Sequence, residues 1–204
     1  MVQVSGLQKA PKTERGRRTR NKLLEAAEAE FGEKGFHEAG ISGITYRAGE
    51  ARGTYYTHFE SKEEIVRALV RYMSQRTREW VSERVAGSPD RLTAERRGIE
   101  AFIEFAREHK AIYRIITEAE FIAPEEYRAH YEGFAHGYEV NMKKAADNGE
   151  LRDGDFELWA WAIMGQTVFL GMRYAEWDDS RPASEIAEIV TDLIAHGIAR
   201  EKSE

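Results

Sequence analysis

Apolar residues recur with α-helical spacing along almost the whole chain, and this periodicity is the strongest constraint on its fold. Near the N-terminus, Leu24, Ala27 and Phe31 fall on one face of a helix. That helix is predicted to begin near Thr19 and to stop at Gly35. No stretch alternates Val, Ile and Thr as a β-strand does. The sequence therefore predicts an all-α fold.

Glycine, proline and capping residues divide the remainder of the chain into further helices. Ser61, followed by Glu63 and Glu64, predicts the start of a long helix that ends near residues 87–89. Later breaks predict helices over about 91–108, 110–121, 124–147, 155–177 and 183–200. Together with two short helices between residues 41 and 59, this pattern predicts nine helices.

Several chemistries are disfavoured by what the sequence lacks. The absence of cysteine excludes disulfides, thiolate nucleophiles and Cys-ligated metal sites. The six histidines show neither helical pair spacing nor an HExxH motif, so neither a metal nor a cofactor is expected. No nucleophile elbow, phosphate-binding loop or dinucleotide motif is present, and we do not expect an enzyme.

Neither a membrane segment nor an export signal is predicted. The longest uncharged run, residues 158–172, is shorter than the roughly 20 apolar residues that a membrane-spanning helix needs. Residues 1–12 lack the apolar core of a signal peptide. We therefore expect a cytoplasmic protein.

The charge is distributed unevenly along the chain. Residues 1–24 contain seven Lys or Arg and one Glu, a net +6, so the remainder carries −12 although the whole chain carries −6. A basic segment ahead of an acidic body is typical of proteins that bind nucleic acid or an anionic surface. We expect residues 1–18 to form a flexible basic arm, with Arg18 and Arg20 contacting the backbone or minor groove of DNA. The alternative is that this segment only increases solubility.

Residues 41–59 have the pattern of a helix-turn-helix. An apolar pair, Ile41 and Ile44, is followed by a turn at Gly49 and then by a second short helix beginning near Arg52. Such a second helix reads DNA when polar and aromatic side chains at its N-terminal end enter the major groove. We expect double-stranded DNA to be a partner.

Residues 19–68 carry many residue types at fixed spacing. They are Thr19-Arg20, Leu24-Glu25-Ala26-Ala27, Phe31, Glu33-Lys34-Gly35-Phe36, Ile44, Arg47-Ala48-Gly49, Gly53-Thr54, Tyr56, Phe59 and Ser61-Lys62-Glu63-Glu64. This set resembles the tetracycline-repressor (TetR) family of transcription regulators and covers about a quarter of the chain. The chain departs from the family pattern at Ser42, Gly43, Thr45, Glu50 and Tyr55.

The predicted DNA-binding residues lie in and just after the second short helix. The resemblance implies that Thr54, Tyr56 and Lys62 touch phosphates, and that Arg52 and Tyr55 lie near base edges. Gly53 is expected to allow close approach of the backbone, and His58 to project further along the helix. Tyr55 has packing as an alternative role, and His58 has an ordinary surface position.

The second half of the chain is rich in aromatic residues at helical spacing, for which core packing is the default explanation. The resemblance implies a ligand-binding domain here, and the same residues suit an apolar pocket. The predicted ligand-binding residues are Phe102, Phe105, Tyr113, Arg114, Phe134, Tyr138, Trp161, Gln166, Phe169 and Arg173. The tract 148–155 resembles a loop of family members that sense acyl-CoA compounds, so a hydrophobic acyl-CoA is the favoured effector.

The predicted organisation is a DNA-binding domain over residues 19–60 and an effector-binding and dimerisation domain over 61–204. A homodimer is expected because one recognition helix reads only a few base pairs. Its interface is predicted on the last two helices, or else these helices only close the monomer core. The predicted function is that of a ligand-responsive repressor. The alternatives are a helical effector-binding or carrier protein that does not read DNA, and a helical enzyme acting on acyl compounds.

Overall fold

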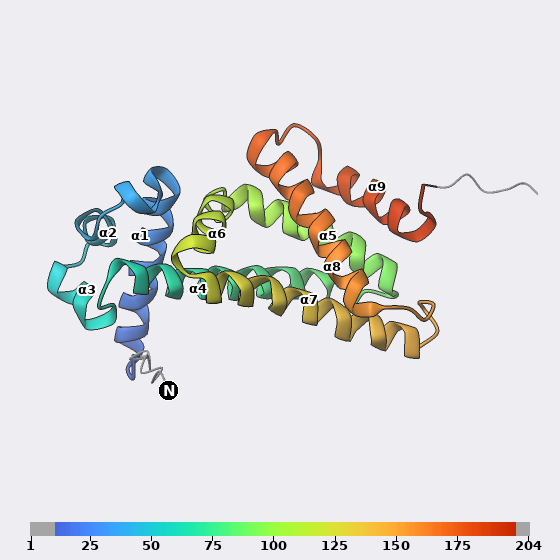
Figure 1. Ribbon diagram of the computed structural model, residues 1–204, viewed down its shortest axis with the longest axis horizontal. Coiled ribbons are helices and arrows are strands. Elements are labelled where there is room, and N and C mark those ends of the chain that lie inside the picture. The colour runs from blue at the N-terminus through green and yellow to red at the C-terminus, as the bar shows by residue number, and fades with distance from the viewer. Residues whose placement is uncertain (1–10, 199–204) are drawn as a thin grey trace, which may run out of the picture.

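The computed structural model describes residues 11–198, and all regular structure in that range is helical (Figure 1). Its nine α-helices are α1 (Glu14–Glu38), α2 (Ile41–Ala48), α3 (Arg52–His58), α4 (Lys62–Val85), α5 (Arg91–Glu108), α6 (Ala111–Ile122), α7 (Pro124–Asp147), α8 (Phe156–Gly171) and α9 (Ala183–His196). A π-helical turn, Met172–Trp177, extends α8. The predicted all-α fold is confirmed. No helix within residues 11–198 is long and apolar enough to cross a membrane.

The first helix begins before the predicted start near Thr19. The Thr13 hydroxyl accepts a hydrogen bond from the backbone N–H of Gly16, which satisfies one of the free donors at the helix start. Glu14, the first residue of the helix, forms an ion pair with Arg18 one turn further along. The prediction of a flexible arm is therefore wrong for the residues from Glu14 to Arg18, which are helical. Residues 1–10 of that predicted arm lie outside the described part of the chain.

The far end of α1 is fixed by α6. Gly35 takes a positive φ of 76°, which favours glycine and breaks the helical path near the predicted stop. The N–H of Phe36 then donates to the Glu118 carboxylate at 2.6 Å, and Arg114 donates to the carbonyl of Glu33 at 3.1 Å. Arg114, predicted to bind ligand, instead caps the C-terminal end of α1.

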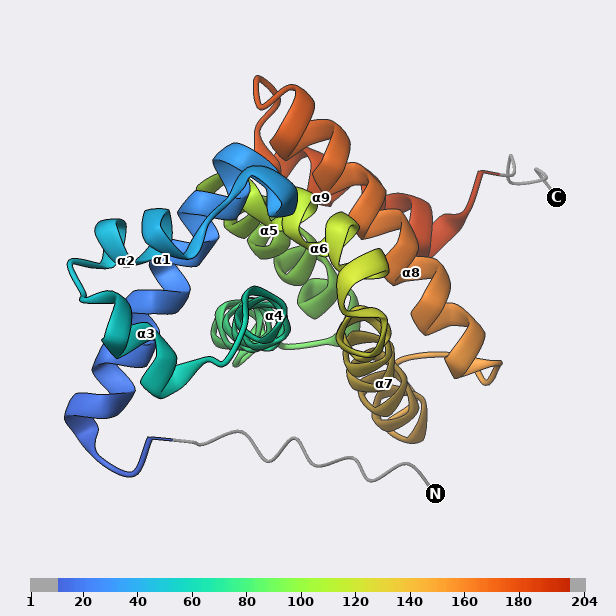
Figure 2. The same ribbon diagram turned by 60° about the vertical axis from the view of Figure 1, so that its left-hand side comes forward.

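The long helix α4 lies between two groups of helices, which we name the head (α1–α3) and the body (α5–α9). Figure 2 views α4 nearly end-on, with α1 and α3 on one side and α5 to α8 around the other. One hydrophobic core continues from Phe31 and Phe59 in the head, through Leu69 of α4, to Ile112 and Ile116 of α6. Head and body are therefore packed on the same helix without an intervening linker.

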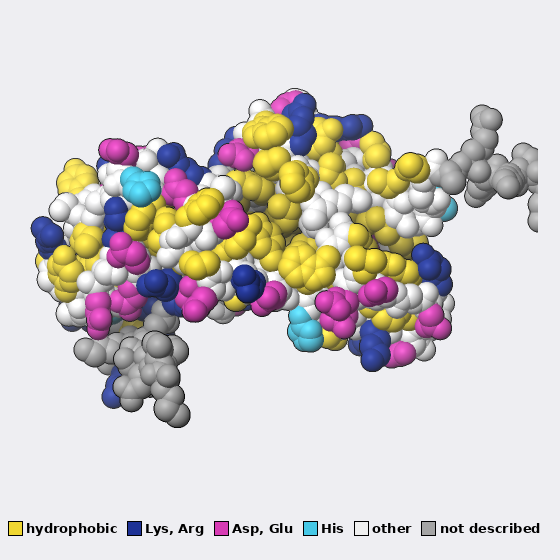
Figure 3. Space-filling view, in the orientation of Figure 1, with side chains coloured by type: hydrophobic (Ala, Val, Ile, Leu, Met, Phe, Trp, Pro, Cys, Tyr) yellow, Lys and Arg dark blue, Asp and Glu magenta, His cyan; other side chains and the backbone are white. Residues whose placement is uncertain are grey.

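The last helix covers α5. Ile186 and Val190 of α9 are buried against Ile99 and Ile103, so they close the core of this chain and do not form the predicted dimer interface. Hydrophobic residues remain exposed on α8 and α9 at Trp161, Phe169, Ile189 and Leu193. Figure 3 shows hydrophobic side chains gathered over the α8 region.

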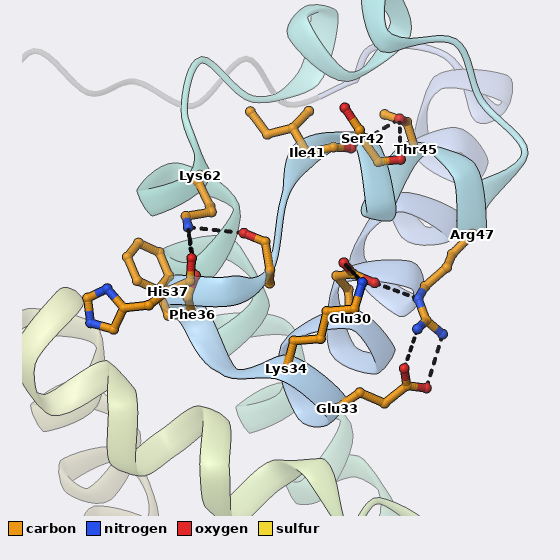
Figure 4. A network of polar contacts seen from close by, with 11 residues as sticks. Glu30, Glu33, Lys34, Phe36, His37, Ile41, Ser42, Thr45, Arg47 and Lys62 are labelled. Carbon is orange, nitrogen blue, oxygen red and sulfur yellow. Dashed lines mark hydrogen bonds and ion pairs between the residues drawn. The ribbon is translucent and has the colours of Figure 1, made fainter.

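Within the head, a buried carboxylate joins α1 to α2 (Figure 4). Glu30 is only 1% exposed, and it accepts hydrogen bonds from Lys34 and Arg47, each at 2.7 Å. Burial opposes ionisation of Glu30, but the two cations hold its pKa below the usual value. Arg47 also pairs with Glu33 on the surface. Helix α2 is thus held to α1 by charge as well as by Ile44.

The unusual glycine of α2 has a packing explanation. A Cβ atom at Gly43 would overlap the Glu30 carboxylate, which Lys34 and Arg47 hold in place. Glycine is therefore required for α2 to lie this close to α1. This departure from the family pattern leaves the helix-turn-helix intact.

We predict that Gly43→Ala lowers the free energy of unfolding by roughly 1–2 kcal/mol, measured by urea denaturation. Alanine in place of glycine normally favours a helix by up to about 1 kcal/mol, but displacing buried Glu30 costs more than this gain. Gly53→Ala is the control, since its Cβ would meet no atom within 4 Å. Equal or greater stability of Gly43→Ala would contradict this account.

Candidate DNA-binding surface and ligand cavity

The outer face of α3 presents polar and aromatic groups to solvent. Arg52 and Gly53 are exposed in its first turn, and Tyr56 is 47% exposed. The Arg52 guanidinium lies 6.0 Å from the centre of the Tyr56 ring. Thr54 is partly exposed beside them. This arrangement suits a helix that enters a major groove, and the individual contacts remain predictions.

Tyr46 is a surface aromatic that the sequence reasoning missed. It lies on α2 and is 88% exposed. Its position two residues after buried Ile44 places it on the opposite face of α2, a signal that was available in the sequence. Tyr46 adds a hydrogen-bonding group to the exposed surface of the helix-turn-helix.

The prediction that Tyr55 lies near base edges is wrong. Its side chain is fully buried, its ring packs 5.6 Å from that of Phe59, and its hydroxyl donates to the carbonyl of Ser61 at 2.8 Å. Burial raises the pKa of Tyr55 above its ordinary value. Tyr55 thus fixes α3 to the start of α4, and Tyr56 is the tyrosine that faces solvent.

The side chain of Lys62 also forms hydrogen bonds within the protein. Its ammonium donates to the carbonyls of Phe36, His37 and Ala39 at 2.6, 3.4 and 3.1 Å (Figure 4). The ammonium has three N–H donors, and each has a carbonyl acceptor. The phosphate contact of Lys62 stays a prediction, and it would compete with these carbonyl contacts. The charge of Lys62 ties the start of α4 to the end of α1.

Two further predicted DNA-binding residues meet beside α3. The Arg20 guanidinium lies 4.6 Å over the ring of Phe59, and burial together with Arg71 lowers its pKa. His58 is partly buried, and burial and the nearby charge of Arg20 lower its pKa as well. The N-terminal half of α1 thus reaches the end of α3 through Arg20. Arg18, two residues earlier, is exposed.

A cavity of about 190 Å³ lies between α4, α5, α7 and α8. Its walls are mainly apolar and include Phe102, Phe134 and Tyr138, three of the predicted ligand-binding residues. Val81 and Val85 bring the second half of α4 into the same wall. The cavity is an apolar site against the helix that carries the head.

The other predicted ligand-binding aromatics lie outside this wall. Phe105 is buried against Trp80, so it belongs to the core. Tyr113 donates its hydroxyl to the carbonyl of Val168 at 3.0 Å. Trp161 and Phe169 point outwards, and Phe169 is 68% exposed. Their aromatic character was visible in the sequence, but the direction of each side chain was not.

The predicted polar ligand-binding groups also lie elsewhere. Arg173 pairs with Asp178 at 3.3 Å on the surface. The side-chain nitrogen of Gln166 is buried and has no hydrogen-bond partner within residues 11–198, yet Gln166 does not line the cavity. Neither residue therefore supplies a polar contact in this cavity.

The polar groups that do line the cavity were missed. Glu95 is only 3% exposed and pairs with Arg91, whose Nε donates at 2.8 Å. Burial raises the pKa of Glu95, and Arg91 opposes that shift. Arg78 and His130 also line the wall. A usable signal existed, because Glu95 precedes buried Ile99 by four residues and shares its helix face.

A second cavity, of about 500 Å³, adjoins the first. Both are lined by Arg91 and Glu95. The loop tract 148–155 contributes Arg152, whose guanidinium lies 4.4 Å over the ring of Trp159, another lining residue. The two cavities therefore share the buried ion pair of Arg91 and Glu95. Residues of the tract 148–155 line the second cavity.

Known proteins share both parts of this architecture. The model of bacterial regulatory proteins of the tetR family matches residues 23–69, which include α2 and α3. The HTH-type transcriptional regulator YvdT of Bacillus subtilis is 29% identical over 140 residues, or 68% of this chain and 72% of YvdT.

Two solved structures extend the likeness in fold to most of the chain. FadR of Bacillus subtilis, solved with stearoyl-CoA, has a TM-score of 0.78 at 18% identity over 88% of this chain and 99% of FadR. AibR, solved with isovaleryl coenzyme A and operator DNA, has a TM-score of 0.67 at 18% identity over 86% of this chain and 97% of AibR. Residues 23–69 therefore match the tetR family of bacterial regulatory proteins, and the fold of most of the chain is that of the FadR and AibR structures.

Proposed function

We propose that this protein is a cytoplasmic repressor that leaves its operator when a hydrophobic small molecule fills the cavity. The observation that carries the proposal is that α4 belongs to both sites. Its first half, at Ile65 and Leu69, lies in the core shared with the head, and its second half, at Arg78 and Val81, lines the cavity. A helix of 24 residues spans about 36 Å, so it links the two sites as one element.

DNA recognition requires two copies of the head. Two recognition helices set one DNA turn apart, about 34–36 Å, read a longer site than one does. The exposed hydrophobic residues of α8 and α9 support the prediction that the dimer interface lies on these two helices. Residues 19–60 then act as the DNA-binding domain, and the rest of the chain binds the effector and the second copy.

An acyl-CoA is the effector class we favour. The acyl-CoA compounds in the FadR and AibR structures support this choice. The apolar first cavity suits an acyl chain, and the adjoining cavity is lined by Arg152, whose positive charge suits an anionic group. Gly43, one of the departures from the family pattern, would favour the rival carrier function, but its packing against Glu30 accounts for it within an intact helix-turn-helix.

We predict that Arg52→Ala and Tyr56→Ala affect operator binding differently. Arg52→Ala should cost roughly 1–3 kcal/mol and relax the preference at one base pair, if its guanidinium forms a bidentate base contact. Tyr56→Ala should weaken binding to all sequences alike. Fluorescence anisotropy on DNA from upstream of its own gene, with single-base variants, measures both effects. Unchanged affinity of both variants would contradict the placement of α3 in the groove.

We predict that Arg17→Gln with Arg18→Gln flattens the plot of log affinity against log salt concentration. Each lost phosphate contact should reduce the slope by about 1, because fewer counterions are released on binding. Lys143→Gln with Lys144→Gln is the control, since these exposed lysines lie near the end of α7 and carry the same charge. An equal slope in the two double variants would exclude a DNA contact at the start of α1.

We predict that a saturating acyl-CoA weakens operator affinity about tenfold or more, through a coupling free energy of roughly 1–3 kcal/mol. Isovaleryl-CoA, decanoyl-CoA and stearoyl-CoA are the probes, with coenzyme A alone as the control. Calorimetry measures binding to the protein, and anisotropy measures release from DNA. Binding without release would contradict the switch, whereas no binding of any probe would contradict the effector class.

A further inference from the structure

A buried pair of polar side chains joins α4 to α7 at the wall of the first cavity. The Oγ atom of Ser74 lies 2.6 Å from Nδ1 of His130, and both residues are buried. The same Oγ also lies 2.6 Å from the carbonyl oxygen of Val70, to which it donates. A hydroxyl has a single proton, so the bond between Ser74 and His130 must be donated by Nδ1–H of the imidazole.

This arrangement fixes the tautomer of His130. With the proton on Nδ1, the second ring nitrogen, Nε2, carries a lone pair and acts as an acceptor. Burial and the nearby charge of Arg78 lower the pKa of His130 to about 4, so the ring is neutral at physiological pH. Within residues 11–198, Nε2 has no hydrogen-bond partner, and His130 lines the cavity. The cavity wall therefore offers an unused acceptor.

The residues around His130 hold its ring in place and restrict the kind of hydrogen-bond donor that Nε2 can accept from. Phe134 packs edge-on against the ring at 5.1 Å, and Tyr131 does so at 4.9 Å. The Arg78 guanidinium lies 5.5 Å over Phe134 and forms no ion pair in the described part of the chain. A cationic donor such as an ammonium would be repelled by Arg78, whereas an uncharged hydroxyl would not.

We propose that the effector carries a hydroxyl group on its hydrophobic part, which donates to Nε2 of His130. His130 is then a specificity-determining residue, and Ser74 is a positioning residue that sets its tautomer from α4. This inference rests on the proposed function and narrows the effector class to hydroxylated hydrophobic molecules, hydroxyacyl compounds included. The contact also connects a ligand on α7 directly to the helix that carries the head.

The tautomer is tested first, by ¹⁵N NMR of the full-length protein without ligand. His130 should show a protonated Nδ1 and a bare Nε2. Ser74→Ala removes the acceptor of Nδ1–H and should populate the Nε2–H form. Thr77→Val is the matched control, since Thr77 is also a buried α4 hydroxyl that donates to a carbonyl one turn earlier, at 2.8 Å from Met73. An Nε2–H tautomer in the unmodified protein would overturn the proposal.

Ligand preference is tested with 1-octanol and 1-methoxyheptane, which have the same number of non-hydrogen atoms but differ in the hydroxyl donor. The unmodified protein should bind the alcohol about tenfold more tightly, as measured by ligand-detected NMR titration. His130→Phe should abolish this preference, because a cavity without the acceptor leaves the alcohol hydroxyl unpaired. Ser74→Ala should reduce the preference, and Thr77→Val should keep it.

The outcomes separate this inference from the proposed function. Equal binding of the alcohol and the ether would overturn the role of His130 and leave the cavity as an effector site. A tenfold preference that survives in both His130→Phe and Ser74→Ala would also overturn it. Failure of operator release by every acyl-CoA, combined with the alcohol preference described above, would contradict the acyl-CoA switch and support the hydroxyl contact.

Discussion

The packing of α4 against both groups of helices is the constraint on which the rest of the structure depends. Protein interiors are close-packed, so a helix with Leu69 in one core and Val81 in a cavity wall cannot shift at one end alone. Its N-terminal end is further fixed by Lys62, which binds three carbonyls at the end of α1. A change in the cavity that moves α4 must therefore be accommodated in the head.

Polar contacts determine how the head can move relative to the body. Glu28 of α1 accepts from Nδ1 of His109 at 2.9 Å, and Arg76 of α4 lies 3.2 Å from the other ring nitrogen. Arg114 and Glu118 of α6 hold the end of α1 in the same way. Hydrogen bonds depend on distance and angle more steeply than apolar contacts do. These contacts favour discrete positions of the head over continuous sliding.

Features that depend on local periodicity could be predicted from the sequence. The direction in which each side chain points in the folded protein could not. Most helix bounds follow from caps and apolar spacing. The start of α1 was predicted near Thr19, but the helix begins at Glu14 because the Thr13 side chain caps it there. Tyr55 and Tyr56 have the same side chain and adjacent positions, and only tertiary packing decides which is buried. The four-residue spacing from Tyr55 to buried Phe59 was a signal for this, since such residues share a helix face.

The lining of the first cavity was harder to predict, because it also depends on where side chains point in the folded protein. The density of aromatic residues pointed to Phe102, Phe134 and Tyr138, which do line the cavity. The same criterion also pointed to Trp161 and Phe169, which are exposed. The polar lining was missed because charged residues one turn apart, such as Arg91 and Glu95, usually lie on a solvated face. The spacing from Glu95 to Ile99 indicates a shared helix face, but the burial of the charged pair depends on the residues of α7 and α8 that lie beside it in the cavity wall.

The buried polar groups of the cavity oppose stability, and this favours a role in recognition. A buried ion pair such as Arg91 with Glu95 is commonly less stabilising than apolar residues of the same volume. Nε2 of His130 likewise has no hydrogen-bond partner within residues 11–198, and it is not one of the fully buried unpaired atoms, so a molecule in the cavity can reach it. Both groups face the same cavity, where a bound molecule can supply the missing contacts. The cavity is therefore polar at the points where a ligand would be distinguished by its hydrogen-bonding groups, and apolar elsewhere.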